Sequence, residues 1–367
     1  MNQIPRKKIA IVTALAGSGH ITVAKVFEYW FDAWGYKSDV LLIGSLLNTI
    51  YTHLLKIPKT WESIYRISNR GYVSHFPVRK FTQGEEKKLM KHVYEYDDYD
   101  LILSTYPMFH PRAGKISAVV LVDPTTHASY FSPPHPDYYI ILWEESLKTL
   151  PDSAKTKSKI ISTGPLARPA FYDVAEKLNS FKDKIYFKEK LGLSPDKRYC
   201  LIMAGGAWIS RAEKFIPLFD KHLDGDIEFV FVCGRNTRFC NKMTKRYGNN
   251  PRFRFLSWLN ETEISEWMGA CDYGIFFSVA QTLTEAGLCL LPVYLFSYIK
   301  GQETAYKDII IDRGLGQNLT GNRTAKVLAF KNLIGQNDPA LEVSMLNFKK
   351  YLENSKNSLR DSLKELL

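Results

Sequence analysis

The chain has 367 residues and a hydrophobic content of 45%, which is typical of a folded protein large enough for two domains. Its formal net charge of +11 favours anionic partners: nucleic acid, acidic lipid or phosphorylated small molecules. The longest apolar run, Gly287–Ile299, is too short to cross a bilayer. We therefore expect it to be a core strand and any membrane contact to be peripheral.

Cysteine usage points to a reducing compartment. All five cysteines lie between Cys200 and Cys289, mostly within apolar runs, and none form a C-x-x-C pair. Buried reduced thiols in a cytosolic protein are therefore expected, rather than disulfides or a metal site.

The first motif is a strand, a glycine-containing turn and a helix. The β-branched run Lys8–Thr13 predicts a buried parallel strand, and a helical pattern follows Ala16–His20. Backbone N–H groups and the helix dipole would make this turn an anion site. Glycines at this spacing also serve turn geometry alone, and His20 could simply be a helix residue that bonds to the loop.

The segment from Gly44 to Lys91, after a second predicted strand at Asp39–Ile43, is rich in aromatic and basic residues. Interleaved rings and cations suit a membrane interface with acidic headgroups. A solvated helical hairpin over the sheet is the plainer alternative. Nucleic-acid binding is a third, although no recognised motif supports it. The residues concerned are Tyr51, Trp61, Tyr65, Tyr72 and Phe76 with Lys56, Lys59, Arg66, Arg70, Arg79, Lys80, Lys87, Lys88 and Lys91.

Two further strands, Leu101–Ser104 and Ala118–Val122, lead to a second polar cluster. Asp123 and His127 follow the latter strand directly. A carboxylate and an imidazole just past a strand end are a plausible acid/base pair. Alternatively, Asp123 caps a turn before a proline and His127 is a loop residue with its hydrogen bonds satisfied.

The segment Ile160–Tyr172 holds one glycine and two prolines, which favours an irregular crossing between two domains. Beyond it we expect a helix at Lys184–Leu191 and a strand at Arg198–Ala204. The glycine loop after that strand precedes Ser210-x-x-Glu213, a capping box that predicts a helix start and a second anion site.

The last third of the chain alternates strands and helices. A strand at Glu228–Cys233 ends at a Gly-Arg-Asn turn, and the stretch Ser257–Gly316 predicts a βαβαβα series. In a parallel sheet, ligands bind beyond the carboxyl ends of the strands. Polar clusters at Thr282–Glu285 and Gly301–Glu303 fall there. Thr282-x-x-Glu285 also fits a capping box, which would explain both residues without a ligand.

These motifs together resemble the nucleotide-sugar half of glycosyltransferase family 28, which has the GT-B fold. That family includes monogalactosyldiacylglycerol synthases, processive diacylglycerol glucosyltransferases and the GlcNAc transferase of the lipid-linked peptidoglycan precursor. The matching segments are G-x-G-H at Gly17–His20, T-x-x-E-A at Thr282–Ala286, Gly301-Gln302-Glu303 and Gly314-Leu-Gly316. One segment departs from the pattern, because Ser278-Val-Ala-Gln281 replaces the family's P-G-G.

The resemblance implies an α/β protein of two Rossmann-like domains with an interdomain cleft. The expected boundaries are 1–163 for an acceptor and membrane domain, 164–340 for the nucleotide-sugar domain, and 341–367 for a terminal helix that returns to the first domain. It implies inverting transfer of a hexose from UDP-glucose or UDP-galactose, as substrate, to diacylglycerol or a glycosyl-diacylglycerol. The protein would be peripheral on the cytoplasmic face of an anionic membrane.

The implied residue roles follow the motifs. His20, Asp123 and His127 are the candidates for proton transfer, and Glu285 would bind the ribose of UDP. Gln302 and Glu303 would hold the sugar hydroxyls. The full set of implied donor-site residues is Gly17, Gly19, Gly205, Gly206, Ala207, Arg235, Leu259, Thr282, Leu283, Glu285, Gln302 and Glu303. We expect neither a metal nor a cofactor, because helix dipoles and cations would stabilise the departing UDP.

Three other functions fit the same pattern. The acceptor could be polyprenyl-linked, although the aromatic and basic insertion argues against it. The protein could be a UDP-sugar epimerase of the same fold, which would need no membrane surface. It could also bind a nucleotide sugar without turnover, which the lost P-G-G would explain.

Overall fold

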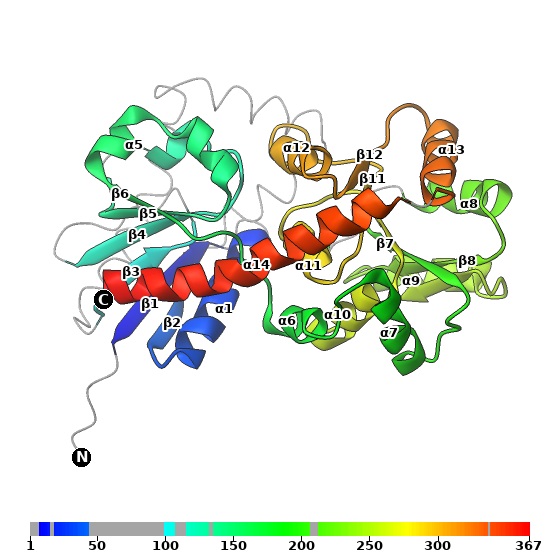
Figure 1. The fold of residues 1–367 in the computed structure, drawn as a ribbon, viewed down its shortest axis with the longest axis horizontal. Coiled ribbons are helices and arrows are strands. Elements are labelled where there is room, and N and C mark those ends of the chain that lie inside the picture. Colours follow the sequence, from blue (N-terminus) through cyan, green and yellow to red (C-terminus); the bar gives the residue numbers. More distant parts are fainter. Residues whose placement is uncertain are drawn as a thin grey trace, which may run out of the picture. The chain divides into compact units, whose positions relative to one another are not determined.

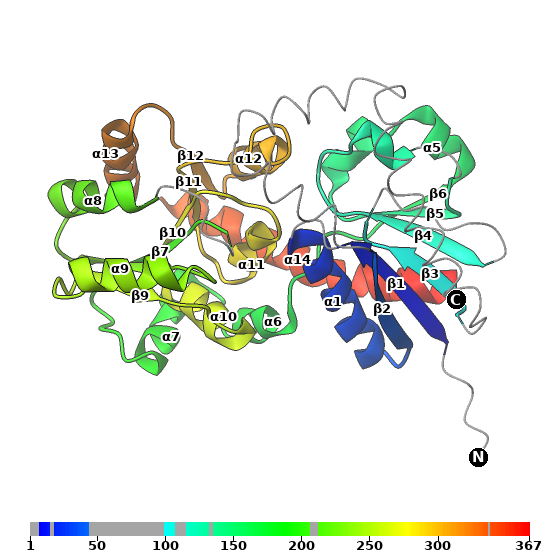
Figure 2. The same ribbon diagram turned by 180° about the vertical axis from the view of Figure 1, so that it is seen from behind.

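The computed structural model describes residues 7–14, 18–43, 99–106, 115–131, 135–205, 212–336 and 338–367. Their contacts divide the chain into two compact units. Unit 1 comprises Met1–Leu166, Lys300–Gln302 and Asn354–Leu367, and unit 2 comprises Ala167–Ile299 and Glu303–Glu353. Each unit contains one sheet with helices around it (Figures 1 and 2).

The sheet of unit 1 has six parallel strands in the order β2-β1-β3-β4-β5-β6. Its central strands consist largely of buried apolar residues, as expected when both faces of a parallel sheet are covered. The strand order reverses between β1 and β3, which creates a topological switch point. The strands are β1 (Lys8–Ala14), β2 (Lys37–Ile43), β3 (Leu101–Ser104), β4 (Ile116–Leu121), β5 (Tyr138–Ile141) and β6 (Lys159–Ser162).

Short helices accompany this sheet. The longest of those that lie between the described strands is α1, which begins at Ser18. Its apolar face buries Val23, Phe27 and Phe31. The helices between strands are α1 (Ser18–Ala33), η2 (Ala128–Phe131), η3 (Glu144–Thr149) and α5 (Asp152–Lys157).

The sheet of unit 2 also has six parallel strands, in the order β12-β11-β10-β7-β8-β9. This is the dinucleotide-fold order, and its switch point lies between β7 and β10. Phenylalanine rings dominate the core on one side of the sheet, with Phe219 stacked on Phe229. The strands are β7 (Arg198–Met203), β8 (Ile227–Val232), β9 (Phe253–Leu256), β10 (Tyr273–Phe276), β11 (Val293–Leu295) and β12 (Gly316–Asn318).

Helices cover both faces of this sheet. The pair α8 and α13 lies on one side, and the pair α7 and α10 lies on the other, as both views show (Figures 1 and 2). The helices of unit 2 are α6 (Pro169–Ala175), η4 (Phe181–Asp183), α7 (Lys184–Lys190), η5 (Ala212–Phe215), α8 (Ile216–His222), α9 (Thr237–Tyr247), α10 (Glu261–Ala270), α11 (Gln281–Leu288), α12 (Thr304–Asp312) and α13 (Arg323–Ile334).

The chain ends in one 28-residue helix, α14 (Pro339–Leu366). Its first part contributes to unit 2 and its last part, from Asn354, contributes to unit 1. In unit 1, Leu359 and Leu363 are fully buried, and Lys356 lies over the Trp30 ring at 4.8 Å. None of the helices in the described ranges is long and apolar enough to cross a membrane.

The predicted α/β class with two Rossmann-like domains is confirmed, but several element boundaries were wrong. Lys159–Ser162 forms strand β6, whereas most of this strand was predicted to belong to the irregular crossing at Ile160–Tyr172. The apolar run Gly287–Ile299, which was expected to be a core strand, is only partly a strand. Helix α11 continues to Leu288, Leu290 turns the chain with a φ of 49°, and β11 begins at Val293. The apolar residues of this run correctly predicted its burial, but they could not distinguish a helix or a turn from a strand.

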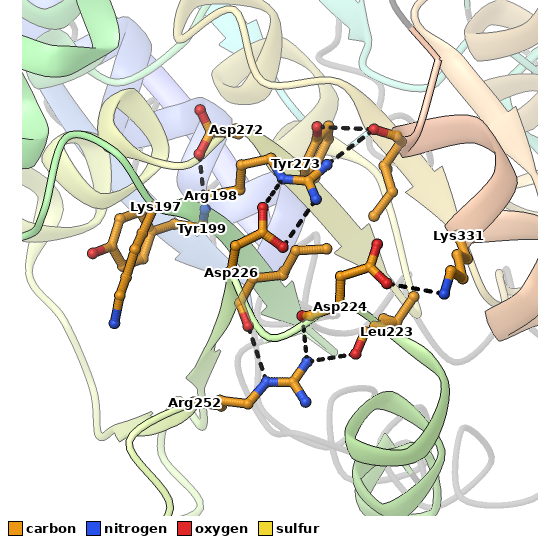
Figure 3. A network of polar contacts seen from close by, with 12 residues as sticks. Lys197, Arg198, Tyr199, Leu223, Asp224, Asp226, Arg252, Asp272, Tyr273 and Lys331 are labelled. Atoms are coloured by element: carbon orange, nitrogen blue, oxygen red, sulfur yellow. Dashed lines mark hydrogen bonds and ion pairs between the residues drawn. The ribbon is translucent and has the colours of Figure 1, made fainter.

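A network of charged residues fixes the amino-terminal edge of the second sheet (Figure 3). Asp224 and Asp226 have D-x-D spacing, although the expectation of a metal-free protein took the sequence to contain no D-x-D. Arg198 donates from Nε and Nη2 to Asp226 at 2.8 and 3.1 Å, and Lys331 pairs with Asp224 at 2.9 Å. Arg252 donates to the carbonyl oxygens of Leu223 and Asp224. Both carboxylates therefore form ion pairs at the amino-terminal edge of the sheet. A ligand would bind at the opposite edge, beyond the carboxyl ends of the strands.

Candidate active site

In unit 1, His20 lies in the first turn of α1, at the switch point of the sheet. Its Nδ1 lies 2.8 Å from the carbonyl oxygen of Thr105, the residue that follows β3. In return, the Thr105 hydroxyl donates to the carbonyl oxygen of His20 at 3.1 Å. A carbonyl can only accept, so Nδ1 carries the proton and Nε2 is the nitrogen with the lone pair. His20 is thus held in the tautomer that a general base needs.

Asp123 and His127 follow β4, the neighbour of β3 in the same sheet. Asp123 is partly buried, and its backbone carbonyl accepts from the Ser146 hydroxyl at 3.0 Å. His127 is 8% exposed, and its ring lies 5.8 Å from that of Tyr130. Asp123 and His20 therefore follow strands that end at the same sheet edge. The low exposure of His127 favours its alternative reading as a satisfied loop residue.

The two glycine turns are only partly described. Gly17, Gly206 and Ala207 lie outside the described residues, as does Ser210 of the predicted capping box. Gly205 has a φ of +75°, a backbone conformation that favours glycine. A Cβ added to Gly19 would meet no atom within 4 Å, so packing between the described residues does not by itself require a glycine there.

The segments that follow β8 and β9 carry a cation and an exposed aromatic residue, respectively. Arg235 follows β8 in a turn where Gly234 has a φ of +60°, and Asn236 then caps α9 through the Phe239 amide. The Arg235 guanidinium lies 4.7 Å from the centroid of the Trp258 ring, and Trp258 is 52% exposed. An exposed indole beside a cation is a suitable platform for a nucleobase. Sequence reasoning selected Arg235 and the partly buried Leu259 but missed Trp258, which lies between β9 and Leu259.

Helix α11 begins at Gln281, and the capping-box interpretation of Thr282 and Glu285 is wrong. The N-cap is Ala280, and no side chain caps the helix. Thr282 is half-buried, whereas the Leu283 side chain is fully buried in the core. Leu283 could therefore reach a donor only through its backbone.

Glu285 is 4% exposed and forms an ion pair that the sequence did not indicate. Arg168 Nε donates to its Oε1 at 2.7 Å, and the same guanidinium lies over the Phe171 ring at 4.9 Å. Burial raises the pKa of the Glu285 carboxyl, and the charge of Arg168 opposes that rise. The sequence signal for Arg168 was its place beside Pro169 in the predicted hinge, where the segment resembles the family's V-T-G-x-P-x-R-P-x-F pattern. The pair lies wholly within unit 2.

Gln302 and Glu303 differ in their surroundings. Gln302 is half-buried and groups with unit 1, whereas Glu303 is 3% exposed, groups with unit 2 and directly precedes α12. Glu303 Oε1 accepts from the Ser278 hydroxyl at 2.6 Å, and its Oε2 accepts from the Ile299 amide at 2.8 Å. The carboxylate thus has protein partners on both oxygens.

No family model matches the chain, but comparison of its sequence with known proteins finds similar ones. A processive diacylglycerol beta-glucosyltransferase of Bacillus licheniformis is 27% identical over 372 aligned residues, which cover 95% of this chain and 92% of that protein. The chain is a relative of the diacylglycerol glycosyltransferases. Monogalactosyldiacylglycerol synthase 1 of Arabidopsis thaliana is 25% identical over 85% of this chain and 62% of its own length.

Among solved structures, Acinetobacter baumannii MurG superposes with a TM-score of 0.64 at 13% identity, covering 98% of this chain and 100% of that one. This match confirms the GT-B fold. Together with the named relatives, it also confirms the predicted enzyme class, a glycosyltransferase. The predicted resemblance, which the motifs placed between Lys8 and about Gly316, is confirmed over 95% of the chain.

Proposed function

We propose that this enzyme transfers a hexose from a UDP-sugar to diacylglycerol or a glycosyl-diacylglycerol, with inversion at the anomeric carbon and without a metal ion. The observation that carries the proposal is the match along 95% of the chain to a diacylglycerol beta-glucosyltransferase. The described residues at the carboxyl ends of both sheets supply suitable chemistry. The donor would be UDP-glucose or UDP-galactose.

In the proposed reaction, His20 Nε2 takes the proton of the acceptor hydroxyl while that oxygen forms a bond to C1 of the sugar. The bond from C1 to the β-phosphate oxygen breaks, and UDP leaves with the electron pair. Attack from the opposite face of the donor inverts the configuration at C1. Asp123 is the alternative base or the partner of His20.

The donor would bind at the strand ends of unit 2. Trp258 offers a stacking surface for the base, and Glu285 offers a carboxylate to the ribose hydroxyls. In the part of the chain that the structure describes, no side chain caps α11, and the positive end of its helix dipole would stabilise the charge of the diphosphate. These groups would replace a divalent cation as the stabiliser of the leaving group.

We also propose a peripheral position on the cytoplasmic face of an anionic membrane, on the strength of the rings and cations between Tyr51 and Lys91. These residues lie outside the described ranges.

The decisive test is mass spectrometry of products formed from diacylglycerol vesicles and each UDP-sugar, with and without EDTA. We expect hexosyl-diacylglycerol that is insensitive to EDTA. Transfer to a polyprenyl phosphate instead, free sugar or an epimerised UDP-sugar without acceptor, or UDP binding without turnover would each contradict the proposal. Loss of activity in EDTA that added magnesium restores would refute only the metal-free part.

A further inference from the structure

Glu303 has the contacts of a structural anchor. It is 3% exposed, and its two carboxylate oxygens accept from the Ser278 hydroxyl at 2.6 Å and the Ile299 amide at 2.8 Å. The Glu303 amide also donates back to the carbonyl oxygen of Ile299 at 2.8 Å. Hydrogen bonds to an ionised acceptor are short and strong, so this side chain is fixed in place.

These bonds join two loops that follow neighbouring strands. Ser278 lies in the loop after β10, and Ile299 and Glu303 lie in the loop after β11. A second side-chain bond runs between the same loops, because the Ser297 hydroxyl donates to the carbonyl oxygen of Phe277 at 2.9 Å. The two loops therefore hold each other through side chains as well as through the sheet.

The position of Ser278 determines where α11 begins. Only two residues separate Ser278 from Gln281, the first residue of α11. No side chain caps this helix, so the backbone before it sets the direction of its first amides. Under the proposed function, those amides meet the donor diphosphate.

This loop is also where the sequence departs from the family that it resembles, since Ser278-Val-Ala-Gln281 replaces P-G-G. Neither proline nor glycine could donate a side-chain hydrogen bond to Glu303. We propose that Ser278 and Glu303 form a positioning pair that holds the start of α11 against the donor diphosphate. The proposal rests on the proposed function, because it assigns Glu303 a role within the same donor site.

The experiment measures UDP affinity by calorimetry, and kcat and KM for the UDP-sugar, in Ser278→Ala, Glu303→Ala and the double variant. UDP carries no hexose, so a residue that binds only the sugar cannot affect its affinity. Ser278→Ala should weaken UDP binding about tenfold, and Glu303→Ala by at least as much, because Glu303→Ala also removes the acceptor of the Ile299 amide. The double variant should be no weaker than Glu303→Ala, because the bond between Ser278 and Glu303 is lost in all three variants. KM should rise more than kcat falls.

Two variants serve as controls. Ser278→Thr keeps a hydroxyl at the same place, so it should retain near-normal UDP affinity. Ser265→Ala removes another buried hydroxyl of unit 2, one that donates to the Thr262 carbonyl within its own helix, and should change nothing. Hydrogen exchange at Val279–Leu283 should quicken in Ser278→Ala and Glu303→Ala but not in either control.

Several results would overturn the proposal. If Glu303→Ala lowers turnover but leaves UDP affinity intact, and Ser278→Ala is normal, Glu303 is a sugar ligand. Additive losses in the double variant would show that the two residues act separately. If the wild-type protein binds no UDP, the proposed function fails. In that case the free energies of unfolding of Ser278→Ala, Glu303→Ala and the double variant still show whether Ser278 and Glu303 interact, because non-additive losses of stability require a contact between them.

Discussion

One backbone carbonyl determines the tautomer of the His20 imidazole. The bond from Nδ1 to the Thr105 carbonyl oxygen fixes which nitrogen can accept a proton, without a charged partner. We expect His20→Ala to lose on the order of 10²–10⁴-fold in kcat, as is typical when a general base is removed. UDP affinity should stay near its starting value, because the proposed donor residues belong to unit 2.

Asp123→Asn is the matched comparison, since it keeps the shape of the side chain but removes its basicity. If Asp123→Asn loses this activity and His20→Ala retains it, Asp123 is the base. Full activity in both variants would mean that the proposed site in unit 1 is misplaced. Nitrogen chemical shifts of the imidazole provide a readout independent of activity, and should report a proton on Nδ1 at neutral pH.

Glu285 combines a buried carboxylate with a single cation. We expect Glu285→Gln to weaken UDP binding by about 1–3 kcal/mol, because charged hydrogen bonds to the ribose are lost. 2′-Deoxy-UDP should show a smaller loss, since one of those bonds is already absent. Calorimetry with both nucleotides measures the difference.

The control for Glu285 is Glu261→Gln. Glu261 contributes to the same charge cluster but accepts from the Ala170 amide at 2.9 Å, so its substitution should leave UDP affinity unchanged. If Glu285→Gln binds both nucleotides as well as the wild type and melts at a lower temperature, Glu285 is only an anchor for Arg168.

At this scale, the sequence indicated candidate residues but not their partners. The T-x-x-E-A spacing selected Glu285 but could not reveal Arg168, because the two are 117 positions apart. Likewise, Glu303 was assigned to the sugar from its motif, whereas its contact with Ser278 depends on how two loops fold. Such pairings are set by tertiary packing, which local patterns do not encode.

Among the elements, α11 is unusual because a buried lysine lies at its carboxyl end. Lys184 Nζ donates to the carbonyl oxygen of Cys289, the C-cap, at 3.0 Å. Burial lowers the pKa of Lys184 from 10.5 to about 8. Between these two values the unfolded chain binds more protons than the folded one, so stability should rise with pH. The rise due to this one group is at most about 3 kcal/mol.

The measurement compares wild type with Lys184→Met by denaturant unfolding from pH 7 to 10.5. The advantage of wild type should grow with pH above about 8. The experiment compares the two variants because the Cys271 and Cys289 thiols also change the stability with pH. Burial raises the pKa of both thiols above their ordinary value of 9.0, so above that pH they make the folded protein less stable as the pH rises. Lys182→Met removes an exposed lysine nearby and serves as the control. A wild-type advantage that does not vary with pH would show that Lys184 is not held in its buried place.

Several buried strands were predicted closely, and so was α7, which ends one residue before its expected end at Leu191. β3 matches its expected range, and β7 and β8 deviate by one residue at their ends, because buried parallel strands are continuous apolar runs. β9 lies just before the predicted series, and β12 is too short and polar to produce a pattern. Turns such as that at Leu290 are imposed by the packing around them, so the sequence could not reveal them.

On the scale of the whole molecule, the excess of positive charge should govern where the enzyme works. We expect Lys56→Glu, Arg66→Glu and Arg70→Glu together to abolish sedimentation with anionic vesicles, since each cation near such a surface contributes about 1 kcal/mol. Sedimentation with phosphatidylglycerol vesicles over a range of salt concentrations measures the effect.

Neutral phosphatidylcholine vesicles provide the control for that experiment. Wild type should bind them weakly, and added salt should release it from the anionic vesicles, because salt screens exposed charges. Equal binding to both vesicle types, or binding that survives high salt, would be incompatible with an electrostatic attachment.

The path of α14 has a consequence for how the protein is made. Unit 1 contains the first residues of the chain together with Asn354–Leu367, whose Leu359 and Leu363 are fully buried. Domains usually fold in the order in which they leave the ribosome. Here the unit that is synthesised first cannot complete its core until the final turns of the last helix emerge. Nascent chains that stop before Asn354 should therefore carry a protease-sensitive unit 1, so losing the segment Asn354–Leu367 should damage the unit that is synthesised first.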